Sequence, residues 1–98
     1  MTMRIYDKAS WHIDANEPKK DVIKRFNELM QWCYNHNLLT EDGKEIIAIG
    51  IDDSISIHSL LFTPIGNKLL CWLFDLNQNP YAVTFEEMEN ELSKIHLL

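Results

Sequence analysis

The most apolar stretch of the chain, residues 60–77, predicts a buried helix at the centre of the fold. Thr63 is placed to cap this helix, and Pro64 fits its first turn, where a backbone N–H needs no partner within the helix. At about 100° per residue, one face collects several large apolar side chains. They are Ile65, Leu69, Trp72, Leu73 and Leu76, and the face is widened by Leu70 and Phe74. A helix that is apolar on most sides must be covered on most sides, either within the chain or by a partner.

A second long helix is predicted from Pro18 to Asn37, started by Asn16 or Glu17. One broad face of this helix is apolar, with Val22, Ile23, Phe26, Leu29, Met30, Cys33 and Tyr34. Trp32 lies on the flank of that face. Two interpretations stay open: Trp32 is covered by its own helix or by the N-terminal arm, or it is an exposed contact residue of the kind that anchors interfaces.

Two shorter helices are predicted from their capping residues. Thr40 caps a helix at residues 41–49, which Gly50 ends. Thr84 and Glu87 have the spacing of a capping box at the start of a helix at residues 85–96. Its apolar stripe consists of Phe85, Met88, Leu92 and Ile95. Its outer side carries Glu86, Glu87, Glu89 and Glu91.

Two of these helix starts share a local sequence pattern. Residues 39–47 and 62–70 match in the spacing of a Thr, a Gly and two aliphatic residues, at an offset of 23 residues. Nothing else recurs at this offset. The pattern therefore indicates one way of starting a helix that is used twice, and not a repeat architecture.

Apolar and polar residues alternate from Ile55 to Ser59, which predicts a short strand with Ile55 and Ile57 facing inward. A short strand needs a mate. The candidates are residues 3–6, or residues 11–13 within a segment that alternates from Ser10 to Asp14. The predicted fold is therefore mainly α: one domain over residues 1–98 with three to four helices and at most a minor β element. An α+β fold is the alternative.

The chain is acidic, and its charged residues are unevenly distributed along the sequence. The net charge is −6 with a pI near 5.0, and residues 50–98 hold seven acids against two bases. Nucleic-acid binding requires a basic footprint, so this charge argues against it. The acidic face of the last helix is either only solvated or attracts a basic partner, which the charge would steer toward the C-terminal half.

The sequence carries no motif that predicts catalysis. It has no glycine-rich phosphate loop and no Gly-x-Ser-x-Gly segment, so we predict no catalytic residue, no bound metal and no cofactor. Cys33 and Cys71 lack Cys-x-x-Cys spacing and are predicted to be reduced thiols of a cytoplasmic protein. No apolar signal segment or run of membrane-spanning length is apparent, since Lys68 and Asp75 interrupt the longest run.

A mixed site is the alternative to a protein without catalytic activity. His12 and Asp14 are two residues apart, and with Asp52, Asp53 or His58 folded nearby they would form a small metal-binding hydrolase site. Otherwise His12 is bonded to backbone in a loop, and the two aspartates cap a turn.

The segment Tyr6-Asp-Lys-Ala-Ser-Trp-His12 resembles the opening of a family of small uncharacterised bacterial proteins. Thr63-Pro-Ile-Gly-Asn67 is similar to a later segment of that family, although Ile13-Asp-Ala-Asn16 replaces its glycine-rich continuation. The resemblance implies a cytosolic bacterial protein and transfers no catalytic role. It marks Trp11 and His12 as residues with a structural or binding role. The Leu39-Thr-x-x-Gly43 segment is also similar to the start of the final helix in winged-helix regulators.

Together these patterns favour a protein-interaction module, of an inhibitory or immunity type, without catalytic activity. Its partner is another protein or a second copy of the chain in a homodimer. The candidate binding residues are Trp11, His12, Asp14, Trp32, Asp52 and Asp53. The metal-binding hydrolase is the first alternative. A winged-helix DNA-binding regulator is less favoured, because the basic recognition helix is missing.

Overall fold

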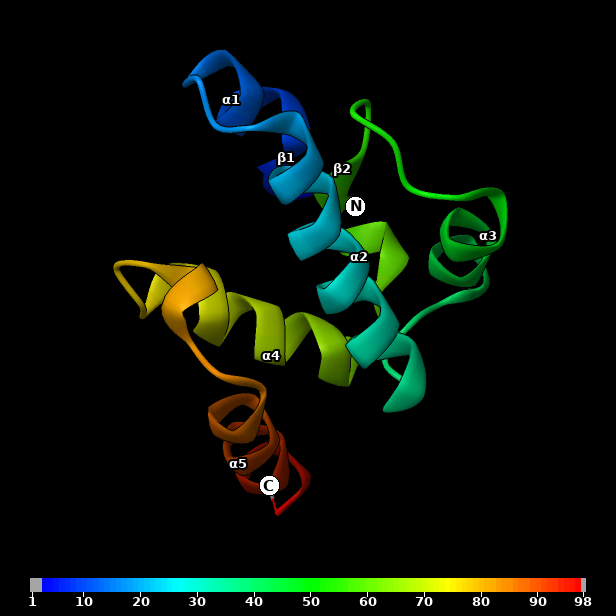
Figure 1. Cartoon of the computed structure of the whole chain (residues 1–98). Helices are drawn as coiled ribbons and strands as arrows, with labels where there is room; N and C mark the ends of the chain where they lie inside the picture. The colour runs from blue at the N-terminus through cyan, green and yellow to red at the C-terminus, as the bar shows by residue number, and fades with distance from the viewer. Residues whose placement is uncertain (1–2, 98) are drawn as a thin grey trace.

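The fold is mainly α-helical with a small two-stranded sheet, which confirms the predicted class. The computed structural model describes residues 3–97 (Figure 1). The elements follow in the order β1 (Ile5–Lys8), α1 (Ala9–Asp14), α2 (Lys19–Asn35), α3 (Glu41–Ile49), β2 (Ser56–His58), η1 (Ser59–Leu61), α4 (Pro64–Asp75), η2 (Pro80–Ala82) and α5 (Phe85–His96).

Helix α4 runs across the middle of the molecule, in contact with β1 on one side and α5 on another (Figure 1). Thr63 caps it by accepting a hydrogen bond from the backbone N–H of Gly66 at 3.1 Å, and Pro64 is its first residue. Leu69, Leu70 and Leu73 are buried. The expectation that Leu76 shares the core face is wrong: the helix ends at Asp75, and Leu76 in the capping position is 76% exposed.

Helix α2 presents its predicted apolar face to the core, with Val22, Phe26 and Cys33 completely buried. The two flanks of this face differ. Phe85 of α5 covers the flank that holds Trp32, so this indole is only 8% exposed. Tyr34 lies on the opposite flank and is 46% exposed, which corrects its assignment to the core face.

The sheet pairs β1 with β2 in antiparallel orientation, with Ile5 opposite His58 and Lys8 opposite Ser56. Ile55 and Ile57 are buried, as predicted. The mate overlaps the first candidate segment, residues 3–6, at Ile5 and Tyr6, but the strand continues to Lys8. The prediction of an extended segment at residues 10–14 is wrong, because the chain turns into α1 directly after β1 and packs on α2.

The two similar helix starts pack against each other, and we call residues 38–43 and 61–66 the helix-start pair. The backbone N–H of Thr40 donates to the carbonyl of Leu61 at 3.0 Å, and that of Thr63 donates to the carbonyl of Leu38 at 2.9 Å. The two segments also form an antiparallel bridge between Leu39 and Phe62. The pattern that recurs after 23 residues therefore forms two reciprocal halves of one contact.

The glycines of the helix-start pair are required by this close approach. A Cβ atom on Gly43 would lie 2.3 Å from the carbonyl oxygen of Leu61, and one on Gly66 would lie 2.7 Å from that of Leu38. Both carbonyls belong to the backbone of the opposite half, and both are held in hydrogen bonds to it. A larger residue would therefore push the two helix starts apart.

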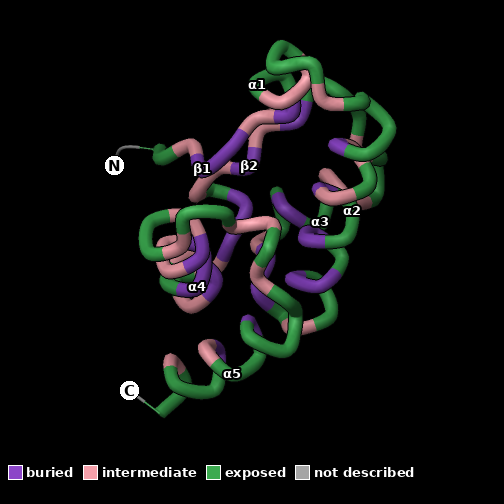
Figure 2. The backbone as a smooth tube through the Cα atoms, turned by 60° about the vertical axis from the view of Figure 1, so that its left-hand side comes forward, coloured by how far each residue is buried: buried purple, intermediate pink, exposed green. Residues whose placement is uncertain are grey.

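Helix α5 begins at the predicted capping box, in which Thr84 and Glu87 bond each other's backbone N–H. It buries Met88 and Leu92 and leaves most of its remaining surface exposed (Figure 2). Phe85, expected in the core stripe, is 42% exposed because it lies at the edge of the contact, against Trp32. None of the helices within residues 3–97 combines the length and the apolar character needed to cross a membrane.

We predict that Gly43→Ala and Gly66→Ala each lower the free energy of unfolding by about 1–3 kcal/mol, because the added methyl group overlaps a fixed carbonyl. An alanine normally stabilises a helix interior relative to glycine, so the expected sign is reversed here. Urea denaturation measures the effect, with Asn90→Ala on the exposed side of α5 as control. A gain in stability from either glycine substitution would contradict the close approach.

Candidate functional site

His12 lies between two carboxylates, at the end of the molecule where α1 packs on α2. Its Nε2 is 2.7 Å from Oδ2 of Asp7, and its Nδ1 is hydrogen-bonded to Oε2 of Glu17. The imidazole also packs edge-on against Phe26 and Tyr81. We call Asp7, His12, Glu17, Arg25 and Tyr81 the His12 cluster.

Asp7 is the buried end of the cluster, with 6% of its surface exposed. Its Oδ1 accepts the backbone N–H of Lys8 at 2.8 Å. Its Oδ2 accepts hydrogen bonds from His12 and from the hydroxyl of Tyr81, which is 74 residues away in the chain. A buried carboxylate needs such donors, and three supply them here.

Arg25 is the other end of the cluster. Its Nη1 donates to Oε1 of Glu17 at 2.9 Å, and its guanidinium lies over the ring of Tyr81, 4.5 Å from the ring centre. Negative and positive groups thus alternate from Asp7 through His12 and Glu17 to Arg25. Alternation makes each charge a partner for the next and keeps the cluster close to neutral.

The geometry favours a protonated His12. Carboxylate oxygens only accept hydrogen bonds, so both ring nitrogens must carry hydrogen to bond Asp7 and Glu17. Burial lowers the pKa of His12, but the hydrogen bonds to Asp7 and Glu17 outweigh burial and raise this pKa above its ordinary value of 6.5. Hydrogen bonds from Arg25 and then His12 lower the pKa of Glu17.

Tyr81 connects the cluster to the apolar core. Its ring stacks on Phe26 and packs edge-on against Phe74. Burial, together with the hydrogen bond to Asp7, raises the pKa of this phenol far above its usual range. Tyr81 is therefore a neutral hydrogen-bond donor that fixes η2 to β1, and not a general base.

The cluster is not arranged to hold a metal ion. The two nitrogens of His12 face in different directions, so Asp7 and Glu17 lie on separate sides of the ring and do not converge on one point. Within residues 3–97, no three His, Cys, Asp or Glu side chains are placed to share a metal ion. Instead, charges and hydrogen bonds of the cluster hold together the continuous segment of β1 and α1, helix α2, and η2.

Arg25 and Tyr81 also line a pocket of about 340 Å³ between α2, α4, α5 and the segment that begins with η2. We call it the Arg25 pocket. Its walls are largely apolar, with Leu29, Leu73, Val83 and Met88. A largely apolar pocket of this size, with a few charged groups in its lining, is typical of a small-molecule site.

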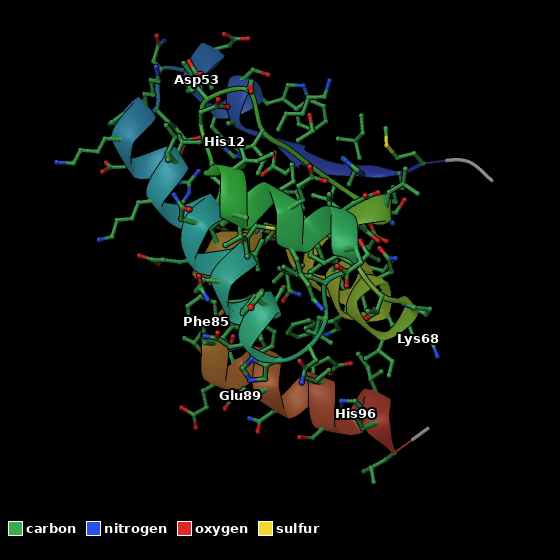
Figure 3. All side chains as sticks on the ribbon, turned by 90° about the vertical axis from the view of Figure 1, so that its right-hand side faces the viewer. His12, Asp53, Lys68, Phe85, Glu89 and His96 are labelled. Carbon is green, nitrogen blue, oxygen red and sulfur yellow. The ribbon has the colours of Figure 1, made fainter. Side chains whose placement is uncertain are left out.

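A second, shallower depression lies between α2 and α5, and we call it the α2–α5 groove. Its lining residues are Asn27, Glu28, Gln31, Trp32, Asn35 and Phe85. The rings of Trp32 and Phe85 are nearly parallel, at 7° and with centres 5.9 Å apart. Phe85 and Glu89 both lie on the part of α5 next to the C-terminal end of α2 (Figure 3), where Glu89 accepts a hydrogen bond from His36 at 3.1 Å.

The structure distributes the candidate binding residues over separate places. His12 is in the cluster, whereas Trp11 is 53% exposed beside Lys8. Asp14 is exposed at the end of α1. Trp32 lines the α2–α5 groove. Its stacking on His36 at the end of its own helix agrees with the first of the two interpretations, but the other cover comes from Phe85 of α5, which neither interpretation included.

The two remaining candidates lie in the loop before β2. Asp52 accepts hydrogen bonds from the backbone and hydroxyl of Ser54, which lower its pKa and fit the predicted turn-capping role. Asp53 pairs with Lys19 at 3.0 Å. His58 accepts the backbone N–H of Leu60 at 3.3 Å. Within residues 3–97, no three of the residues proposed for the metal-binding hydrolase site are placed to share a metal ion.

Sequence reasoning missed four members of the cluster. Asp7 and Glu17 each lie five residues from His12. Side chains at this spacing do not share a face in a regular helix or strand, so the sequence did not predict their contacts. Arg25 lies on α2, eight residues after Glu17. Tyr81 lies in η2, and its contact with Asp7 spans 74 residues. No local pattern could have identified it.

We predict that His12→Gln destabilises the protein more at pH 6 than at pH 8.5. A group with a raised pKa in the folded state contributes its full stability below its unfolded value, and this contribution is lost as the pH rises through the folded value. The expected cost at pH 6 is about 2 kcal/mol, since hydrogen bonds to charged groups are lost.

Urea denaturation across this pH range measures the difference between wild type and variant, and His58→Gln is the matched control. NMR titration of His12 gives its midpoint directly. A midpoint at or below the ordinary value, or a cost that stays constant with pH, would rule out the charged His12.

No protein-family model matches the chain, no curated protein matches its sequence, and no solved structure matches its fold. The resemblance of the segments at Tyr6 and Thr63 to a bacterial family therefore stays a prediction. Within this chain the two segments touch, since the hydroxyl of Tyr6 donates to the side chain of Asn67 at 2.8 Å.

Proposed function

We propose that the protein is an interaction module that binds a basic segment of another protein in the α2–α5 groove. The observation that carries this proposal is an aromatic floor, made by Trp32 and Phe85, beside carboxylates on both helices. Glu28 of α2 lines the groove, and Glu89 of α5 follows Phe85 by one helical turn.

Each part of the groove suits a Lys or Arg side chain. Aromatic faces attract cations, and the face open to one here is that of Phe85, because Trp32 is buried between His36 and Phe85. Glu28 is only loosely paired with Lys24, at 3.9 Å, so its carboxylate has capacity for a second cation. The amides of Asn27, Gln31 and Asn35 supply donors and acceptors for the backbone of an extended peptide.

The overall charge supports the same kind of partner. The net charge of −6 lies mostly in residues 50–98, and Glu86, Glu87 and Glu89 are exposed on α5. Such a field accelerates the approach of a basic protein and disfavours nucleic acid. An acidic module that covers a basic surface fits the inhibitory or immunity type of function. The free thiols of Cys33 and Cys71 support a reducing, cytoplasmic location.

Self-association is the alternative partner, and its main support has weakened. The apolar excess of α4 suggested a homodimer, but Leu69, Leu70 and Leu73 are buried within one chain. Trp72 is half-buried and Leu76 is exposed, so some apolar surface of α4 stays open. Light scattering after size exclusion distinguishes a monomer from a dimer of twice 11.5 kDa.

We expect short random peptides that are displayed on phage and selected on the protein to be enriched in Lys and Arg. The selected peptide, made synthetically, should shift the NMR signals of Trp32 and Phe85 and should bind more weakly as salt is raised. The double variant Glu28→Lys/Glu89→Lys should weaken binding by about tenfold or more, because two attractive charges become repulsive.

The matched control is Glu41→Lys/Glu45→Lys on α3, which makes the same change in net charge away from the groove. Equal weakening by both double variants would show attraction to overall charge and not to the groove. Enrichment of acidic or purely apolar peptides, or signals that shift on another surface, would refute the proposal.

A further inference from the structure

Arg25 has an unused hydrogen-bonding edge. Its Nη1 is bonded to Glu17, whereas Nε and Nη2 are buried and meet no acceptor within residues 3–97. The N–H groups of Nε and Nη2 run parallel on one side of the planar guanidinium, and this side can bind both oxygens of a carboxylate. The contact with the ring of Tyr81 stabilises the charge but satisfies neither donor.

This arginine also lines a largely apolar pocket. Arg25 and Tyr81 line one part of the Arg25 pocket, and Leu29, Leu73, Val83 and Met88 line the rest. A buried donor without an acceptor is costly, and a charged one more so. Arg25 therefore lines a cavity with room for an apolar body and carries two buried donors without an acceptor within residues 3–97.

We propose that the Arg25 pocket binds a small monocarboxylate with an apolar body, and that its carboxylate pairs with the Nε and Nη2 edge of Arg25. A single negative charge suits this site because Arg25 is the only cation among the residues that line the pocket, all of which lie in the described part of the chain. Glu17 already shares its charge, and Glu28 also lines the pocket.

These carboxylates discriminate against other ligands. A phosphate or a dicarboxylate would bring two negative charges, against one for a monocarboxylate, to a pocket where Glu17 already pairs with Arg25 and Glu28 is part of the lining. A neutral apolar molecule would leave the edge of Arg25 unpaired. The proposal goes beyond protein interaction because it concerns a small ligand and needs no partner protein, although the pocket shares Glu28 and Phe85 with the α2–α5 groove.

Binding includes a local opening. Both nitrogens of the free edge are closed to water. The carboxylate therefore reaches them by displacing the side chains that cover them, while the body of the ligand fills the pocket. Tyr81 lies in the linker between α4 and α5. The hydroxyl of Tyr81 bonds Asp7 and its ring contacts Arg25, so Tyr81 attaches this linker to the cluster. Movement of this linker is the simplest way to open the site.

The test is an NMR titration of the full chain with monocarboxylates from phenylacetate to 4-phenylbutanoate, each beside its neutral amide. We expect the acids to shift the signals of Leu73, Val83 and Met88 and the amides to bind about tenfold more weakly. Arg25→Lys keeps the positive charge but has no paired edge, so it should weaken acid binding by a similar factor and leave amide binding unchanged.

Arg4→Met is the matched control, because it removes an arginine that pairs with Asp75 outside the pocket. Val83→Trp fills the pocket with Arg25 intact and should abolish binding, which keeps the test decisive if the Arg25 variant unfolds. Binding by none of the acids, equal binding of acids and amides, or acid binding unaffected by Arg25→Lys would overturn the proposal.

Discussion

The structure depends on the reciprocal backbone hydrogen bonds of the helix-start pair. They place the first turns of α3 and α4 side by side, although 23 residues separate the matching positions. Because β2 and η1 directly precede α4, fixing the start of α4 also fixes the strand on which β1 pairs. The bonds involve backbone atoms, so they constrain only the residues whose side chains would intrude. This explains why the contact demands glycine at positions 43 and 66 and tolerates different apolar residues at 39 and 62.

The His12 cluster performs the corresponding task at the other end of the fold. It joins β1, α1, α2 and η2 through Asp7, His12, Arg25 and Tyr81. Buried ionic groups are costly unless every charge has a partner, and here alternation provides one for each from Asp7 to Glu17. The exception is the free edge of Arg25. A cluster that is otherwise satisfied makes this one unpaired edge informative, because general imperfection of packing does not explain it.

Local chemistry made much of the fold predictable from sequence. The caps at Thr40, Thr63 and Thr84 act within three residues of themselves, so their helices were located correctly. Contacts between distant segments were not predictable in the same way. The alternation at residues 10–14 suggested a strand, but α1 formed because it packs on α2 and brings His12 to Asp7. Likewise the periodicity of α2 could not decide between Trp32 and Tyr34, since the position of α5 determines which flank is covered.

Phe85 links the two proposed sites physically. It is part of the wall of the Arg25 pocket and of the floor of the α2–α5 groove, and Glu28 also lines both. The capping box at Thr84 fixes the backbone immediately before Phe85, whereas Phe85 itself is 42% exposed. Two ligands influence each other only to the extent that each prefers a different arrangement of what they share. If a carboxylate binds only when the linker before α5 moves, its binding would also shift the ring of Phe85. Binding of a carboxylate and binding of a basic peptide would then affect each other through the position of Phe85 or the charge of Glu28.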